Sequence, residues 1–270
     1  FRLMPSVNKW LLASQSIRYG LPLVDHLINE KQKFKNQSFQ NEIIKSFDEV
    51  NLSKISFKNI SFSYSNEIPV LKNINLSLQT GRMYGIKGSN GSGKSSLAFI
   101  ISGLFNATKG EISINDETNE YISKKLLKNA SYVSQNLFLF DDTFTANITF
   151  DRDSSKIKKK TFDKVTALFG IKELADNHIE KMDYKIGENG GNLSSGQRQK
   201  VGLARTFYFD KKIVILDEAT NAIDNKTENK IFESLSEIKK DKIIIIISHK
   251  KDNLNFCDEI LDLDKLNKIN

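Results

Sequence analysis

The sequence contains a single cysteine, Cys257, among its 270 residues. One cysteine excludes an internal disulfide framework and fits a reducing compartment. Long apolar runs are also missing. The longest aliphatic run is the isoleucine stretch Ile243–Ile247, whereas a membrane helix needs about 20 apolar residues. No segment has the pattern of a secretory signal, a zinc-ligand spacing or an internal repeat. These absences exclude a disulfide-stapled scaffold and a zinc module.

Acidic residues are too few to balance the basic ones, which leaves a net charge of +7. A basic excess can indicate a nucleic-acid or anionic-lipid partner. The densest basic run, Lys156–Lys160, has no interleaved aromatic residues on which bases could stack. We therefore predict a solvated helix face there and no nucleic-acid partner.

One segment forms a complete phosphate-binding loop, Gly-Ser-Asn-Gly-Ser-Gly-Lys-Ser, at residues 88–95. Its glycines let backbone N–H groups surround a polyphosphate, its lysine adds a positive charge, and its last hydroxyl can ligate Mg²⁺. The flanking apolar runs predict a strand before it and a helix after it, as this motif requires. The loop predicts binding of a nucleoside triphosphate with Mg²⁺ through Gly88, Ser89, Asn90, Gly91, Ser92, Gly93, Lys94, Ser95 and Ser96.

Two acidic residues, Asp217 and Glu218, follow the apolar run Ile213–Leu216. Such a run is typical of a central parallel strand, whose C-terminal end lies where phosphate-binding α/β sheets place their chemistry. Without the phosphate loop, a solvated acidic pair would be the simpler interpretation. With it, we predict that Asp217 holds the metal and that Glu218 polarises the attacking water.

Small residues at Leu193–Gln197 open a further predicted helix, Arg198–Phe207. A helix N-terminus with free N–H groups forms an anion site. This helix end cannot serve the phosphate that the first loop already holds, but a second copy of the chain could present its own in trans. The pattern predicts contacts to a partner's nucleotide from Ser194, Ser195, Gly196 and Gln197.

Together these motifs resemble the ATP-binding cassette family, whose pieces occur in the same order from about residue 55 to 262. The resemblance implies that Tyr64 stacks on the adenine of ATP. It implies that Gln135 reaches Mg²⁺ and the attacking water, and that His249 contacts the γ-phosphate and orients that water. Asp224 would lie in the loop that crosses between two subunits.

The sequence departs from the family pattern at several of these positions. The family signature is Leu-Ser-Gly-Gly-Gln, and Ser195 replaces its first glycine, where the backbone approaches the γ-phosphate. In the crossing loop, Asn221 and Ile223 stand where serine and leucine are more usual. After His249, Lys-Lys-Asp-Asn replaces the Arg-Leu-Ser-Thr of exporters.

Two stretches resemble the exporter branch of the family in particular. Leu139–Thr143, followed by Asn147-Ile148, is similar to the segment after the exporters' glutamine. Ile186–Gly190 is similar to their cross-linking loop, which contacts the partner's transmembrane helices. The resemblance implies the ATPase half of an exporter, a soluble fragment that works at the cytoplasmic face of the cell membrane beside a transmembrane domain. Two cassettes would pair there, as a homodimer or as a heterodimer.

The first 50 residues have a different pattern. The chain starts at Phe1, and an initiator methionine is normally removed only before small residues, so we expect this start to be a cut in a longer protein. Apolar residues then recur at heptad-like steps, and Gly20 and Pro22 should kink or break the helix. The segment resembles the tail of the last transmembrane helix in exporters of lipid-linked oligosaccharides or related lipids. Residues 30–50 are predicted to be a linker. The seam residues are Leu3, Val7, Trp10, Ser14, Ile17, Leu21, Val24 and Ile28.

The expected fold is α/β. Ser53–Leu78 alternates apolar residues and predicts an antiparallel layer. The phosphate loop, the Asp217 strand and the isoleucine strand predict a mostly parallel core with helices around it. We expect residues 1–50 to form a tail and linker, and residues 51–270 the cassette, with a helical subdomain at about 136–204.

Two other functions share these motifs. A soluble cassette ATPase of the chromosome-maintenance or repair type would insert a long coiled coil between loop and signature, but only about 100 residues without heptads separate Lys94 from Leu193. A regulatory module without turnover would be expected to lose Glu218 or His249, and both are present. The sequence therefore favours an exporter ATPase that uses ATP and Mg²⁺.

Overall fold

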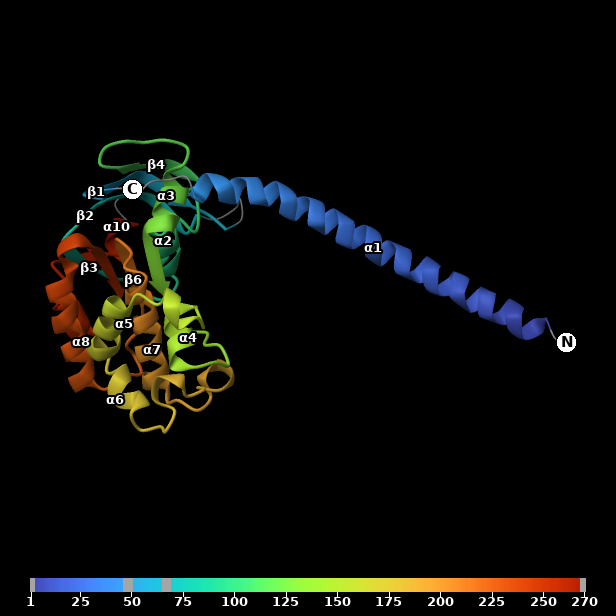
Figure 1. Ribbon diagram of the computed structural model, residues 1–270. Coiled ribbons are helices and arrows are strands. Elements are labelled where there is room, and N and C mark those ends of the chain that lie inside the picture. The colour runs from blue at the N-terminus through green and yellow to red at the C-terminus, as the bar shows by residue number, and fades with distance from the viewer. Residues whose placement is uncertain (1–2, 46–50, 65–68, 268–270) are drawn as a thin grey trace. The chain divides into compact units, whose positions relative to one another are not determined.

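The structure, a computed structural model, describes residues 3–45, 51–64 and 69–267 (Figure 1). The chain divides into two compact units, Phe1–Asp48 and Glu49–Asn270. The second unit contains two sheets and nearly all of the helices. It also contains every residue for which the sequence predicts a catalytic or binding role.

The first unit is built on one long helix, α1 (Met4–Lys45). This helix continues through Gly20 and Pro22 without interruption, so the predicted break is wrong. The linker predicted at residues 30–50 is also helical as far as Lys45, and residues 46–50 lie outside the described part. The reason for the helix beyond residue 30 is composition: Lys, Gln and Glu make up more than half of residues 30–45, and these residues cost a helix little.

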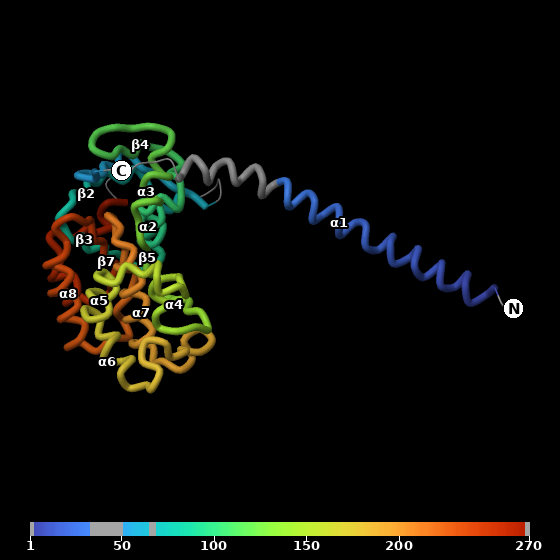
Figure 2. Tube along the Cα trace, in the orientation of Figure 1, coloured from blue at the N-terminus to red at the C-terminus, as the bar shows by residue number. Residues whose placement is uncertain are grey.

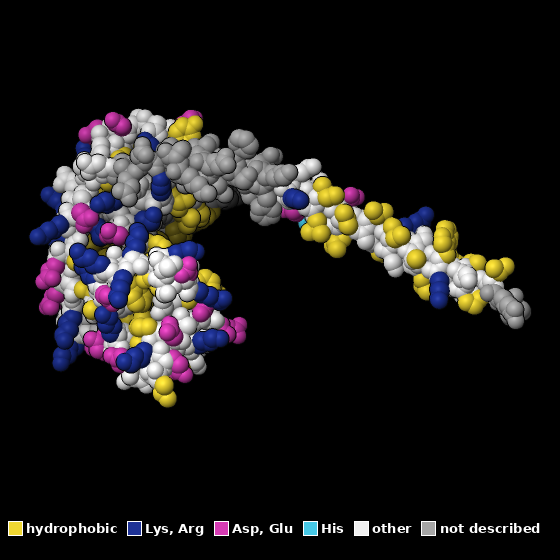
Figure 3. Space-filling view, in the orientation of Figure 1, with side chains coloured by type: hydrophobic (Ala, Val, Ile, Leu, Met, Phe, Trp, Pro, Cys, Tyr) yellow, Lys and Arg dark blue, Asp and Glu magenta, His cyan; other side chains and the backbone are white. Residues whose placement is uncertain are grey.

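Helix α1 exposes large apolar side chains along the part whose side chains are described (Figure 3). They include Val7, Trp10 and Ile17 of the predicted seam, but also Leu12 and Leu23, which lie off the seam. Among the described residues, no helix is both long and apolar enough to cross a membrane. A partner for this seam therefore remains a prediction.

An antiparallel sheet of three strands forms one layer of the second unit. Its order is β2-β1-β4, from β1 (Lys54–Phe62), β2 (Leu71–Gln79) and β4 (Lys109–Ile114). Ile55 pairs with Leu78 on one side and with Ile114 on the other. The antiparallel layer predicted from Ser53–Leu78 is confirmed, and β4 is an additional strand that the sequence pattern did not indicate.

A five-stranded parallel sheet forms the centre, in the order β5-β6-β7-β3-β8. Its central strand β7 consists of isoleucine alone, Ile243–Ile247. Ile243, Ile245 and Ile247 pack in the core that faces the antiparallel sheet, while Ile244 and Ile246 pack in the core on the other face. An unbroken apolar run is stable here because both faces are covered. The predicted parallel core is confirmed, with strands β3 (Arg82–Lys87), β5 (Ala130–Val133), β6 (Ile213–Asp217), β7 and β8 (Glu259–Asp262).

The helices separate into two groups around the parallel sheet. Helix α2 packs in the core shared with the antiparallel sheet, whereas α4, α5, α7 and α8 contribute to the core on the opposite face. Helices α4 to α7 lie together at the end of this unit away from β4 (Figure 2). The bounds are α2 (Lys94–Ile101), α3 (Ile122–Asn129), α4 (Phe144–Thr149), α5 (Lys159–Leu168), α6 (Ile171–Ala175), α7 (Ser195–Tyr208), α8 (Asn225–Ile238), α9 (Lys251–Leu254) and α10 (Leu263–Leu266).

Candidate active site

The phosphate loop connects β3 to α2 at the carboxyl end of the parallel sheet. Gly93 adopts φ +96°, and a Cβ there would lie 2.8 Å from Leu71 Cδ2, so glycine is required on both counts. Lys94 Nζ donates hydrogen bonds to the carbonyls of Gly88 and Ser89, both at 2.9 Å. The lysine therefore lies over the loop that an anion would enter.

The C-terminal segment braces this loop from outside. Asp264 accepts hydrogen bonds from Ser89 N at 2.8 Å and from Ser89 Oγ at 2.7 Å. Asn267 Nδ2 donates to Ser92 O at 3.1 Å and to Val70 O at 3.3 Å. Sequence reasoning missed both braces, because more than 170 residues separate Ser89 from Asp264 and no local pattern marks the contact.

Ser95 and Asp217 come together although they lie far apart in the chain. Ser95 Oγ donates to Asp217 Oδ2 at 3.0 Å. Tyr132 OH donates to the same oxygen at 2.5 Å, and burial, reinforced by the Asp217 carboxylate, raises the pKa of this phenol, so that it remains a donor. A hydroxyl and a carboxylate fit Mg²⁺, which prefers one or two protein oxygens and keeps several waters. In the described part of the chain, no group of three His, Cys, Asp or Glu side chains could hold a metal.

Glu218 follows directly, in an unusual backbone conformation. Its φ is +52°, a left-handed value that is uncommon for residues other than glycine and concentrates at functional sites. Glu218 N donates to Ile247 O at 3.0 Å, which ties the residue to β7. The carboxylate Oε1 then lies 3.2 Å from His249 Nε2, and Asn221 Nδ2 donates to Oε2 at 2.9 Å. The structure thus brings together the two residues for which hydrolytic roles were predicted.

Gln135 lies at the same edge of the sheet. It follows β5, whose Val133 pairs with Leu216 of β6, the residue immediately before Asp217. Its side chain is exposed. Its position fits an approach to the metal and to the attacking water, and that role stays a prediction.

Tyr64 lies beside the helix that follows the phosphate loop. Its hydroxyl and Ser96 Oγ are 2.9 Å apart and share a hydrogen bond. The ring packs at steep angles against Phe62 and Phe105, with centroids 5.0 and 5.9 Å away, and the residue remains 63 % exposed. The tyrosine is thus fixed at two points while much of its surface stays accessible to a planar base.

The signature segment, Leu193–Gln197, begins α7. Ser194 caps the helix by accepting from Gln197 N, while the Gln197 side chain accepts from Ser194 N, a complete capping box. Ser195 is exposed at the first helical position. A Cβ at Gly196 would lie 2.6 Å from Ala222 O, so the helix packs closely on the loop before α8.

Asp224 ends that loop. Its carboxylate accepts from Thr227 N at 3.0 Å and caps α8, and these hydrogen bonds lower the pKa of Asp224. Among the described residues, no hydrogen bond joins Leu193–Gln197 or Asp224 to the phosphate loop of the same chain. Their predicted contact with the nucleotide of a second copy stays a prediction.

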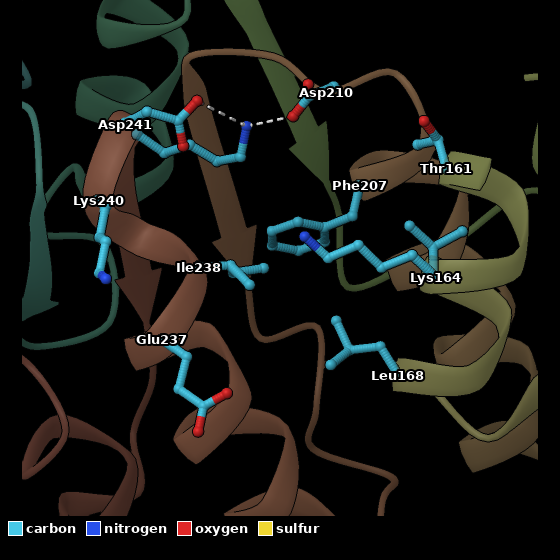
Figure 4. Close-up of a pocket in the computed structure, with 11 residues that line it drawn as sticks. Thr161, Lys164, Leu168, Phe207, Asp210, Glu237, Ile238, Lys240 and Asp241 are labelled. Atoms are coloured by element: carbon cyan, nitrogen blue, oxygen red, sulfur yellow. Dashed lines mark hydrogen bonds and ion pairs between the residues drawn. The ribbon is translucent and has the colours of Figure 1, made fainter.

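A cavity of about 360 Å³ lies near the amino ends of the parallel strands, opposite the end that carries the phosphate loop (Figure 4). It is lined by α5, the end of α7 and the residues before β7, including Lys242. The Lys242 ammonium is nearly buried and pairs with Asp210 at 2.5 Å and with Asp241 at 3.9 Å. Ligands of open α/β sheets bind at the carboxyl ends of the strands, and this cavity is at the amino ends. We therefore assign the site to the edge that carries Lys94, Asp217 and Glu218.

Comparison with known families supports this assignment. Residues 71–221, more than half of the chain, match the model of a family described as ABC transporter. The chain belongs to the ABC transporter family. The matched region is the ATPase domain of these transporters, and it binds ATP.

This ABC domain is similar to curated flippases. It is 34% identical over 213 residues to the ATP-dependent lipid A-core flippase of Aliivibrio fischeri, covering 78% of this chain and 36% of the flippase. With the flippase of the same name from Escherichia coli K12 it shares 34% over 209 residues, covering 77% and 36%. The chain thus spans little more than a third of the length of these relatives.

A solved structure of an ABC exporter is also similar to this chain. The bacterial Atm1-family ABC exporter with ATP bound superposes with a TM-score of 0.73 at 26% identity, covering 87% of this chain and 43% of that one. Flippase and exporter relatives favour the exporter class over the chromosome-maintenance or repair type. The expected family, α/β fold class and ATPase class are confirmed.

Proposed function

We propose that this domain binds Mg-ATP and closes with a second copy around two nucleotides to drive export or flipping of a lipid or lipid-linked oligosaccharide. The observation that carries the proposal is the convergence of Ser95–Asp217 and Glu218–His249 at one sheet edge. The flippase relatives support the lipid class of substrate. In this proposal the domain works at the cytoplasmic face of the cell membrane, beside the transmembrane domain of the same transporter.

Each residue has a role that follows from its position in the site. Backbone N–H groups of the phosphate loop and Lys94 hold the phosphates, and Tyr64 stacks on the base. Ser95 and Asp217, with Gln135, would hold Mg²⁺, which neutralises phosphate charge when bound. Glu218 polarises the attacking water, and His249, 3.2 Å from its carboxylate, orients the water and the γ-phosphate.

The second copy would complete each site. In the described part of the chain, no hydrogen bond joins the first turn of α7 to its own phosphate loop, and a helix N-terminus attracts anions. Closed two-fold symmetry would place the signature segment of each chain on the other chain's nucleotide, which gives two composite sites. Asp224 would lie at the crossing between the two chains.

The proposal is tested by Glu218→Gln. This change keeps the shape of the side chain and removes the base, and loss of a general base typically lowers the rate by about 10²–10⁴-fold. We expect ATP affinity in calorimetry to stay within twofold of the parent and ATP-bound dimers to accumulate in size-exclusion chromatography. Hydrolysis by the variant at the parent rate would rule out this role for Glu218.

A further inference from the structure

Asn221 contacts the carboxylate that the proposed chemistry depends on. Its Nδ2 donates to Glu218 Oε2 at 2.9 Å, while Oε1 of the same carboxylate lies 3.2 Å from His249 Nε2. The two oxygens of Glu218 are therefore held by side chains from two different segments. The terminal torsion of a glutamate is otherwise broad and weakly restrained.

The backbone on either side of Asn221 is fixed by α7. Gln199 Oε1 accepts a hydrogen bond from Ala222 N at 2.9 Å, and Gln199 Nε2 donates to Glu218 O at 3.5 Å. Gly196 packs so closely on the same loop that a Cβ would lie 2.6 Å from Ala222 O. A displacement of α7 would thus displace the loop that positions Asn221.

We propose that Asn221 is a positioning residue for Glu218 and that Gln199 anchors Asn221 to the signature helix. This rests on the proposed hydrolytic role of Glu218. The amide donor restrains the carboxylate without adding charge, which holds the proposed base in a fixed orientation. Helix α7 begins with the signature segment. A partner that binds this segment and displaces α7 would therefore also displace the Glu218 carboxylate of the same chain.

The first test compares two substitutions at one position. Asn221→Ala removes the donor, whereas Asn221→Asp keeps the shape and places a like charge against Glu218. We expect kcat to fall about 10-fold for Asn221→Ala and about 100-fold for Asn221→Asp, with KM and melting temperature unchanged. The matched control, Asn255→Ala, removes an exposed asparagine and should retain the parent kcat.

A purely structural role predicts the opposite order, because aspartate fills the same space as asparagine. Parent-like kcat in Asn221→Asp, or a loss expressed in KM alone, would overturn the proposal. So would a rise of kcat in Asn221→Ala, since the residue would then restrain the reaction rather than support it. Glu218→Gln separates the hydrolytic role of Glu218 from the positioning role of Asn221. If Glu218→Gln is inactive while both Asn221 variants have the parent kcat, only the positioning role is wrong.

The second test addresses the anchor. If Gln199 acts through Asn221, the Gln199→Ala/Asn221→Ala double variant should lose no more kcat than the worse single variant, because both changes break one path. Independent effects would multiply instead. Multiplied losses would contradict the link from α7 to Glu218.

Discussion

At the scale of single residues, Tyr64 sets what the base contributes to binding. Stacking requires only a flat π face and reads no base edges, and the Tyr64 hydroxyl is already engaged with Ser96. We therefore expect GTP to compete with ATP at nearly equal affinity, and Tyr64→Ala to weaken both nucleotides together.

Competition binding with a fluorescent nucleotide measures this. The informative control is Tyr64→Phe, which keeps the ring and removes only the hydroxyl bonded to Ser96. It should stay close to the parent. Loss of ATP binding with GTP binding intact would contradict the stacking role.

The sequence predicted candidate residues for the site but not the contacts between them. Lys94, Asp217 and Glu218 stand in motifs whose spacing is local, so each could be predicted from its neighbours. The Tyr132 bond to Asp217 and the Asn221 bond to Glu218 could not. The first joins neighbouring strands far apart in sequence, and the second depends on the left-handed backbone of Glu218.

At the scale of elements, Lys242 fastens the start of β7 to the end of α7. Its side chain is 6 % exposed, and its ammonium donates to Asp210 and to Lys211 O. Lys242→Ala removes buried methylenes and the polar contacts of the ammonium with Asp210, Asp241 and Lys211 O. The free energy of unfolding should therefore fall by about 1–3 kcal/mol. The cost stays below that of a fully buried ion pair because Asp210 is well exposed and regains water.

Urea titration of the variant measures this loss. Lys240→Ala, on the exposed neighbour, should remain within about 0.5 kcal/mol of the parent. Equal stabilities for the two variants would show that the Lys242 ion pair contributes nothing measurable.

Element prediction from the sequence succeeded where apolar periodicity was strong. The isoleucine strand and the alternating residues of β1 and β2 were identified from the sequence. A strand buried on both faces has a continuous apolar run, and a strand buried on one face has alternating apolar residues. Helix α1 was mistaken at Pro22 and beyond residue 30, since a polar stretch without an apolar stripe can be a helix or a linker. Strand β4 was missed because only its last residues are buried.

At the scale of the whole molecule, hydrolysis should depend on pairing of two chains. When residues 1–270 are studied alone, no tether holds two copies together, so the effective concentration of the partner is low. We expect the ATPase rate per chain to rise with protein concentration. Mixing Lys94→Ala with Ser194→Arg chains should restore one composite site and part of the activity, although each variant alone is inactive.

Cross-linking distinguishes the outcomes of that mixture. Mixed dimers that close on ATP but stay inactive would mean that both sites must work together. Absence of closed mixed dimers, at concentrations where the parent is active, would count against presentation of the signature segment in trans.

The position of β3 between β7 and β8 has a consequence for biosynthesis. The strand that leads into the phosphate loop is complete at Lys87, but both of its neighbours, Ile243–Ile247 and Glu259–Asp262, are translated more than 150 residues later. While the ribosome adds those residues, β3 has two open edges, and such edges favour aggregation of nascent chains. Strands β7 and β8 must therefore be translated before β3 can pair on both sides and hold the phosphate loop in the parallel sheet.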